Sequence, residues 1–339
     1  MAEISSIGPI GGVDVQAVTL VGAGLRVRLL TFGARLAELW VPDRNGAQAD
    51  IVLGQDNLAG WQAHGAYVGA TCGRYGNRIA DGRFTLDGRV VHVDQNEGAQ
   101  HLHGGVAGFD LKVWEIASHG ADHVTFVTTS ADGEMGYPGT VRARVTYRIT
   151  GLGLLIEMAA TTDAPTVVNM VNHAYFNLAG QGAGDVMGQH LQVDAGHYLP
   201  VDTRLIPTGE VLSVTGTAFD FREIRAVGAM LPGPGGFDHN LCLASPLAAD
   251  GLRDCLVATD PASGRRLRLR TNQPGVQLYT GAHFNGGPGK AGARYPRFAG
   301  FATETQCFPD SPNHPHFPQA RLLPGETYLH QMQFDLAPA

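Results

Sequence analysis

Apolar and polar residues alternate along the chain from end to end, which is the pattern of strands that bury one face. The clearest run covers residues 141–149, in which Val141, Val145 and Tyr147 alternate with arginine and threonine. The same pattern predicts strands at 17–21, 25–30, 90–93, 123–128, 154–160, 189–193, 267–270, 275–279 and 329–336. Amphipathic helices of three turns or more are nearly absent, so parallel sheets with crossover helices are not expected.

Turn signals separate these runs, as expected of hairpins and short loops. Examples are Asp87-Gly88, Asp132-Gly133 and Asn285-Gly286-Gly287, and the chain holds 46 glycines in all. The chain contains no repeat of 20–50 residues and no linker that would divide it. We therefore predict an all-β protein, residues 1–339 forming a single domain: a large antiparallel β-sandwich with few short helices. A curved sandwich can leave a concave face, where polar side chains bind a polar ligand.

The charge of the chain narrows the choice of partner. There are 31 Asp and Glu residues against 24 Lys and Arg residues, a formal net charge of −7, and no dense basic run. A nucleic-acid or anionic-membrane partner is therefore not expected, and a small neutral molecule fits better. No stretch reaches the roughly 18 apolar residues of a membrane span, and the start lacks a basic region followed by an apolar one. We expect a cytoplasmic protein, either monomeric or homodimeric.

The cysteines and glycines carry no cofactor signature. Cys72, Cys242, Cys255 and Cys307 are scattered without a C-x-x-C pair, so we expect reduced thiols rather than a zinc or redox motif. No glycine-rich phosphate-binding pattern is present either. We expect no cofactor and no metal.

Polar and ionisable residues gather in six segments of a chain that is otherwise poor in charge. These are 73–79, 100–105, 172–178, 237–240, 273–277 and 301–306. Neutral sugars are bound by amide, carboxylate and guanidinium groups together with an aromatic face, and the segments supply that set. Glu304 lies among apolar residues, where a carboxylate is costly unless it is hydrogen-bonded or functional.

Each candidate also has a structural explanation. The arginines can be surface residues, and His173 can be a buried, hydrogen-bonded imidazole beside an aromatic cluster. His101 and His103 would share a face of a strand and could bind a metal, although structural histidines are more common. Together with His314-x-His316 they leave open a metal-dependent isomerase or oxygenase. A non-catalytic sugar-binding protein is a further alternative.

Eight ordered motifs show that the chain resembles the aldose 1-epimerase, or galactose mutarotase, family over nearly its whole length. They are GRYGNRIADGRF from position 73, QHLHGG ending at 105, GFDLKVWE at 108–115, DGEMGYPG at 132–139, NHAYFNLAG at 172–180, FDHN at 237–240, QPGVQLYTG at 273–281 and ETQCFPDSPNHPHFP at 304–318. The resemblance implies a large β-sandwich with the sugar in a cleft on one sheet. It also implies interconversion of the α and β anomers of a free aldose such as galactose or glucose, by acid–base ring opening and reclosure.

The same resemblance implies roles for individual residues. Glu304 would be the general base and His173 the general acid. The sugar site would be lined by Asn77, Arg78, His103, Tyr175, Asp238 and Gln277, with Arg74 as a less certain member. One departure is Tyr75-Gly76, where relatives often carry a small apolar pair such as Val-Ala, and it bears on the local fit of the Arg78 loop.

Overall fold

The alternating run at residues 141–149 forms strand β13 (Val141–Ile149), whose odd-numbered side chains are buried. Arg142 and Arg144 on the opposite face are exposed. The other predicted ranges also overlap strands of the computed structural model, which describes residues 2–63 and 66–336. Burial of one face of each strand thus explains why the alternation predicted these elements.

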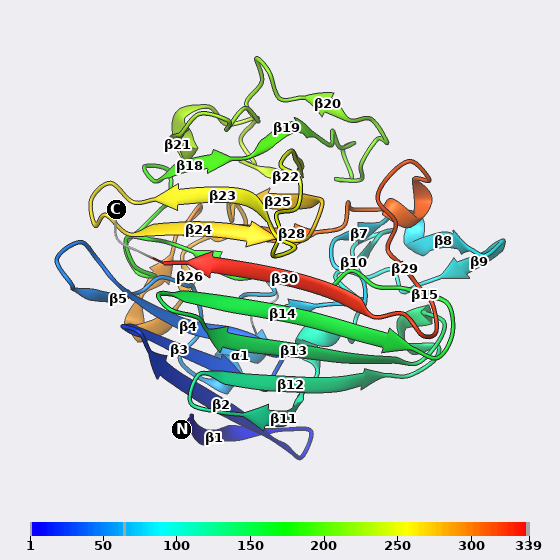
Figure 1. The fold of residues 1–339 in the computed structure, drawn as a ribbon, viewed down its shortest axis with the longest axis horizontal. Helices are drawn as coiled ribbons and strands as arrows, with labels where there is room; N and C mark the ends of the chain where they lie inside the picture. The colour runs from blue at the N-terminus through cyan, green and yellow to red at the C-terminus, as the bar shows by residue number, and fades with distance from the viewer. Residues whose placement is uncertain (1, 64–65, 337–339) are drawn as a thin grey trace.

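A nine-stranded antiparallel sheet forms one layer of the molecule (Figure 1). Its strands, in spatial order, are β11 (Glu115–His119), β12 (His123–Ser130), β13, β14 (Gly153–Thr162), β30 (Tyr328–Asp335), β24 (Arg266–Thr271), β23 (Arg253–Thr259), β18 (His190–Val193) and β21 (Arg225–Ala226).

A six-stranded sheet lies behind the nine-stranded one in the view of Figure 1. Its order is β17 (Tyr175–Phe176), β28 (Phe301–Gln306), β25 (Gly275–Tyr279), β22 (Asp238–Leu243), β19 (Ala195–Tyr198) and β20 (Leu212–Ser213). Successive side chains of a strand point to opposite faces. On β25, Val276 therefore joins the core between the layers, while Gln277 points to the other face.

The remaining strands form an N-terminal sheet and several two-stranded pairs. The N-terminal sheet is β1 (Glu3–Ile10), β2 (Val13–Gly22), β3 (Leu25–Leu30), β4 (Arg35–Pro42) and β5 (Gln48–Asp50). The pairs are β6 (Thr71–Cys72) with β16 (Val171–Asn172), β7 (Arg78–Ile79) with β10 (His101–Leu102), β8 (Arg83–Leu86) with β9 (Arg89–His92), β15 (Thr166–Val167) with β29 (Arg321–Leu322), and β26 (Gly287–Pro288) with β27 (Arg294–Tyr295).

Helices are short throughout the described residues. They are α1 (Leu58–Ala63) and the 3₁₀ turns η1 (Ala80–Gly82), η2 (Phe109–Leu111), η3 (Glu134–Gly136), η4 (Val227–Ala229), η5 (Lys290–Gly292) and η6 (Ser311–Asn313). The predicted antiparallel β-sandwich with few short helices is confirmed. Among the described helices, none is long and apolar enough to cross a membrane.

One large apolar cluster fills the space between the sheets. It combines side chains from the start and the end of the chain, such as Val18 of β2, Phe301 of β28 and Phe334 of β30. A buried polar contact also joins the layers, because His330 of β30 lies 2.7 Å from the hydroxyl of Thr305 on β28. The cluster shows that the sheets share one core.

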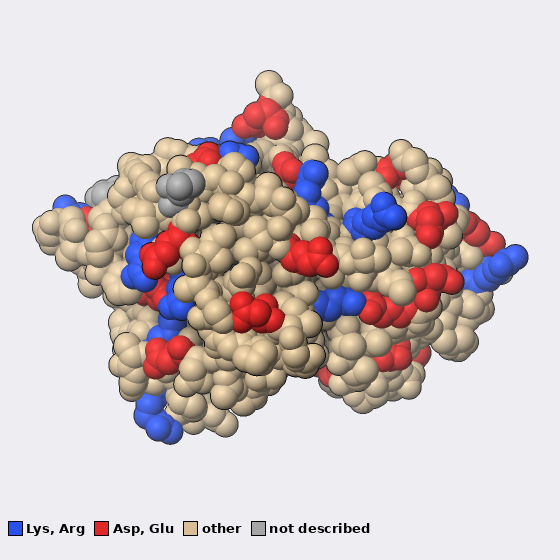
Figure 2. Space-filling model, turned by 90° about the horizontal axis from the view of Figure 1, so that it is seen from below, with Lys and Arg blue, Asp and Glu red and all other residues tan. Residues whose placement is uncertain are grey.

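Charged side chains of both signs are mixed on the surface, and the thiols are unpaired. Figure 2 shows acidic and basic side chains interspersed over one face of the molecule. The four cysteines are free, and Cys72, Cys255 and Cys307 are buried.

Candidate active site

The register of the six-stranded sheet brings two rows of side chains onto one face. In antiparallel pairs, directly opposed residues lie side by side, and residues two apart on a strand share a face. The first row is Tyr175, Ala302, Tyr279 and Asp238, on β17, β28, β25 and β22. The second row is Glu304, Gln277 and Asn240, on β28, β25 and β22.

A reciprocal contact between two loops supplies the opposite wall of the site. The Asn77 N–H donates to His103 Nδ1 at 3.1 Å, and the His103 N–H donates to the Asn77 carbonyl at 3.2 Å. Gly104 permits this approach, since a Cβ there would lie 1.8 Å from the carbonyl oxygen of Gly73 and its φ is +97°. The glycine of the QHLHGG motif therefore fixes how closely the two loops pack.

These walls enclose a cavity of about 290 Å³. Its lining residues are Ala66, Tyr67, Asn77, Arg78, Glu97, Leu102, His103, His173, Tyr175, Asp238, Tyr279, His283 and Glu304. The lining combines polar groups with aromatic rings, which is the composition of a site for a small polar ligand.

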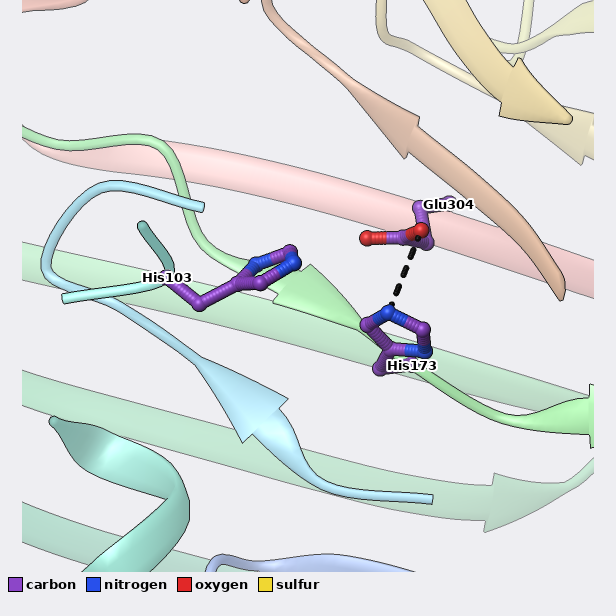
Figure 3. Close-up of side chains that lie close together, drawn as sticks. All are labelled: His103, His173 and Glu304. Carbon is purple, nitrogen blue, oxygen red and sulfur yellow. Dashed lines mark ion pairs between the residues drawn. The ribbon is translucent and has the colours of Figure 1, made fainter. Parts of the chain in front are cut away.

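Glu304 and His173 face each other at the inner end of the cavity. The distance from His173 Nε2 to Glu304 Oε1 is 3.5 Å, and both side chains are buried. Figure 3 shows the two imidazole rings and the carboxylate converging on one space. Glu304 Oε2 is buried without a hydrogen-bond partner among the described residues. A buried acceptor left in this state is poised for a ligand hydroxyl.

Burial dominates the protonation of this pair. It raises the pKa of Glu304 well above the usual range, with a further increase from Asp238 and an opposing decrease from Arg78. It lowers the pKa of His173 to about 3. Each group is therefore shifted toward its neutral form, which is the behaviour of desolvated groups.

Arg78 is held by two carboxylates. Its Nε and Nη2 atoms donate to Glu97 at 2.6 and 2.8 Å, and its Nη1 lies 3.7 Å from Asp238 Oδ2. Burial lowers the pKa of Arg78, but the bonds to Glu97 and the charge of Asp238 raise it above its usual value. Arg78 is therefore a permanent cation in the cavity wall.

A chain of amides orients Asp238 from behind. Gln306 Nε2 donates to Gln277 Oε1 at 3.3 Å, and Gln277 Nε2 donates to Asp238 Oδ1 at 2.6 Å. One Asp238 oxygen is thus committed to the protein, while the other, Oδ2, lies on the Arg78 side.

The protonation of His103 follows from its bond to Asn77. Because Nδ1 accepts the Asn77 N–H, the neutral ring carries its proton on Nε2. Burial lowers the pKa of His103 well below its usual range, so the ring stays neutral. The site therefore receives a hydrogen-bond donor from His103.

The same bond bears on metal binding. Ligand atoms of His103, His173 and Glu304 lie within 4.8 Å of one another, a spacing that can hold a metal ion. A metal on His103 Nε2 would require the proton to move to Nδ1, where it would meet the Asn77 N–H. This geometry favours a proton-transfer site over a metal site.

A second groove, of about 340 Å³, lies on the outer surface against β18 and β23. Its arginines are already paired: Arg268 Nη2 lies 2.6 Å from Asp254, and Arg222 Nη2 lies 2.7 Å from Asp220. The unpartnered Glu304 oxygen and the converging rings belong to the first cavity.

The structure brings most of the predicted site residues together. Asn77, Arg78, His103, His173, Tyr175, Asp238 and Glu304 line the cavity. Gln277 lies behind Asp238 and contacts it rather than the lining surface.

Arg74 points elsewhere. Its guanidinium donates to the hydroxyl and carbonyl of Ser130 and to the carbonyls of Ala131 and Pro138. These bonds commit Arg74 to the fold, and the less certain expectation that it joins the sugar site is wrong.

His101 and His103 do not share a strand face. β10 ends at Leu102, and His103 has a φ of +51°. The His101 ring instead lies 2.6 Å from the Tyr137 hydroxyl and 2.6 Å from the Asp94 carbonyl. His101 is therefore a structural histidine.

Six lining residues were missed from the sequence, and four of them have polar or aromatic side chains: Tyr67, Glu97, Tyr279 and His283. Tyr279 had a usable signal, because it lies two residues after Gln277 on a predicted strand and shares its face. Tyr67 follows α1 in a turn with φ +55°, and Glu97 precedes β10 in a loop, where no periodic pattern marks them.

A β-sandwich with a buried carboxylate–imidazole pair among hydrogen-bonding groups on its six-stranded sheet belongs to the class of proteins that have a built site for a small polar ligand. Known proteins agree with this class. The model of the aldose 1-epimerase family matches residues 16–335. Galactose mutarotase from Bos taurus is 44% identical over 336 residues, covering 98% of this chain and 96% of the relative.

Aldose 1-epimerase from Escherichia coli (strain K12) is 37% identical over 323 residues, covering 92% of each chain. The crystal structure of an aldose epimerase homologue from C. elegans superimposes with a TM-score of 0.88 at 31% identity, covering 95% of this chain and 99% of that one. The chain belongs to the aldose 1-epimerase family, as its motifs predicted, and is an isomerase.

Proposed function

We propose that this mutarotase interconverts the α and β anomers of a free aldose such as galactose or glucose, with Glu304 as general base and His173 as general acid. The observation that carries the proposal is the separation of 3.5 Å between His173 Nε2 and Glu304 Oε1. Anomer exchange moves one proton off the C1 hydroxyl and another onto the ring oxygen. Both oxygens are bonded to C1, so the base and the acid must lie close together.

Glu304 and His173 together can carry both proton transfers of the reaction. In ring opening, the Glu304 carboxylate takes the C1 hydroxyl proton, the bond from C1 to the ring oxygen breaks, and protonated His173 gives its proton to that oxygen. After rotation about C1–C2, the ring oxygen attacks the other face of the carbonyl carbon. His173 takes the hydroxyl proton back, and Glu304 protonates the carbonyl oxygen.

The neutral pair is the state reached when the sugar is open. Burial favours this neutral pair over the ionised pair from which ring opening starts. The charge of Arg78 opposes the shift at Glu304 and supports its ionised form for the first step.

The other lining residues have positioning and electrostatic roles in this proposal. The Nε2–H of His103 and the guanidinium of Arg78 are donors for charge that develops on the sugar oxygens. Asp238 and Asn77 anchor distal hydroxyls, and Tyr175 offers an apolar ring surface to the sugar.

The test is optical rotation of freshly dissolved α-galactose and α-glucose, measured above the spontaneous rate. Glu304→Gln keeps the size of the side chain but removes the proton acceptor, so it should lower kcat by roughly 10²–10⁴-fold. His173→Asn should lower kcat by a similar factor. Because the two groups act as a unit, the double variant should lose less than the product of the single losses.

The matched control is Glu157→Gln, a half-buried carboxylate of β14 that pairs with Arg144 away from the cavity. It should retain full activity. If Glu304→Gln keeps more than about a tenth of kcat, the role of Glu304 is refuted. A wild-type protein that binds sugar without mutarotation would favour a non-catalytic binding protein, and activity lost to chelation and restored by one metal would favour the metal-dependent alternative.

The remaining expectations rest on the sequence. A cytoplasmic location, a monomeric or homodimeric state, the lack of a cofactor or metal, and the absence of nucleic-acid and membrane partners stay predictions. The single domain over 1–339 also stays a prediction, and the core shared by β2, β28 and β30 supports it.

A further inference from the structure

Arg78 is the only arginine or lysine among the described residues that line the cavity, and three carboxylates lie around it. Asp238 forms a long ion pair with Arg78: Arg78 Nη1 lies 3.7 Å from Asp238 Oδ2, which is beyond hydrogen-bond distance. Opposite charges in a buried site attract strongly, and closing this pair to hydrogen-bond distance would satisfy both groups. Neither group would then be available to sugar hydroxyls.

Glu97 occupies the other edge of the same guanidinium. Its two oxygens accept from Arg78 Nε and Nη2 at 2.6 and 2.8 Å, which is the bidentate geometry that fixes the plane of an arginine side chain. Asp238 is held in its turn by Gln277 through Oδ1. The gap between Arg78 and Asp238 is therefore set from both sides by residues outside the acid–base pair.

We propose that Glu97 is a positioning residue that holds Arg78 back from Asp238, so that both remain open to hydroxyls of the bound sugar. The inference rests on the proposed function, because it assigns these two groups to sugar binding. The chemical class of ligand it implies is a neutral polyol whose adjacent hydroxyls can bridge a guanidinium and a carboxylate.

The first measurement is KM and kcat for mutarotation by Glu97→Gln. The amide of this variant would offer one neutral acceptor in place of two charged ones, so we expect KM to rise roughly tenfold, with a smaller effect on kcat. Glu97→Asp is the second variant: it keeps the charge, but its side chain is one methylene shorter and no longer reaches the two nitrogens, so KM should rise in the same direction. Glu157→Gln serves again as the control and should leave KM unchanged.

The second measurement separates positioning from a general loss of structure. Asp238→Asn removes the charge that attracts Arg78, so Glu97→Gln should raise KM much less in that background than in the wild type. An equal rise in both backgrounds would overturn the inference, and so would a wild-type KM in Glu97→Gln. Melting temperatures of all variants identify any that fail to fold.

Sugar affinity measured by calorimetric titration keeps this test distinct from that of the proposed function. If the wild-type protein binds galactose but does not mutarotate it, the proposed function fails while the affinities of the Glu97 variants still decide the positioning role. If the wild type mutarotates and the Glu97 variants match it in affinity and KM, only the positioning role fails.

Discussion

The burial of Glu304 lowers the stability of the folded protein. Its carboxyl group is buried, and burial raises its pKa well above the usual range. A group whose pKa is raised by folding stabilises the protein fully below its unfolded pKa, and this stability is lost as the pH rises through the folded pKa. At neutral and alkaline pH, the ionisable side chain therefore destabilises the native protein.

Glu304→Gln should consequently raise the melting temperature while it lowers activity. Gln has the shape of the protonated carboxyl group at every pH, so its advantage over the wild type should be larger at pH 8 than at pH 5, reaching on the order of a few °C. Thermal unfolding of both proteins at the two pH values measures this difference. A difference that is independent of pH, or a lower melting temperature at pH 8, would contradict the prediction.

Two strands that carry site residues, β28 and β22, were not predicted from the sequence, whereas β25 was. β13 shows clear alternation because one of its faces is exposed to solvent. In β28, whose sequence is FATETQ, all six residues are buried. One face of β28 meets the core and the other meets the cavity, so polar residues replace the apolar or solvent-exposed ones that an alternation search expects. β22, which carries Asp238, was not predicted for the same reason.

The family motifs pointed to site residues that the alternation of apolar and polar residues does not mark. The roles expected of Glu304, His173 and Asp238 came from resemblance. Their meeting in one cavity depends on strand register between segments far apart in the chain. Neither the Arg78–Glu97 pair nor the true contacts of Arg74 could be predicted, since both depend on loop conformations without a period.

Tyr75 braces the loop that presents Arg78. Its buried hydroxyl donates to the Phe308 carbonyl at 2.9 Å and accepts from the Ser311 N–H at 3.1 Å. In the same turn, the Asp310 N–H donates to the Arg78 carbonyl at 2.9 Å. The large side chain thus ties η6 and the loop before it to β7.

Tyr75→Phe should destabilise the protein and weaken sugar binding together. Removing the hydroxyl takes a partner from two buried backbone groups, at a cost of about 1–3 kcal/mol, and KM should rise as the Arg78 loop loosens. Tyr295→Phe is the matched control, because its hydroxyl contacts Gly54 and Gln181 rather than the Arg78 loop. The control should lose stability with little change in KM, and equal changes in KM for both variants would refute the bracing role.

Buried histidines make the whole molecule sensitive to acid. His330 bridges the two sheets, with Nε2 2.7 Å from the Thr305 hydroxyl and Nδ1 2.8 Å from the Met170 carbonyl. Burial lowers the pKa values of His330 and His101 to about 4. A histidine with a lowered folded pKa contributes stability above its unfolded pKa and loses it as the pH falls toward the folded pKa.

The contribution of these histidines to the unfolding free energy should therefore fall between pH 7 and pH 5, opposite in sign to the contribution of Glu304. Each of these two histidines should contribute a loss on the order of 2 kcal/mol at pH 5, because its unfolded form takes up a proton first. Urea unfolding at both pH values measures the loss, and His330→Gln should reduce it. His92→Gln, at an exposed position of β9, is the control and should behave like the wild type. An equal loss in His330→Gln and the wild type would exclude His330 as a source.

The place of β30 in the nine-stranded sheet has a consequence for folding during synthesis. β30 lies between β14 and β24, yet it is synthesised after every other named strand. On the ribosome, the two halves of that sheet must wait with unpaired inner edges until residue 335 has emerged. Exposed edges of this kind invite pairing with other chains, and sheets built from distant segments close slowly. Chaperones that protect the nascent chain during this interval should therefore raise the yield of folded protein. The gain should be larger than for a protein whose sheets close in the order of synthesis.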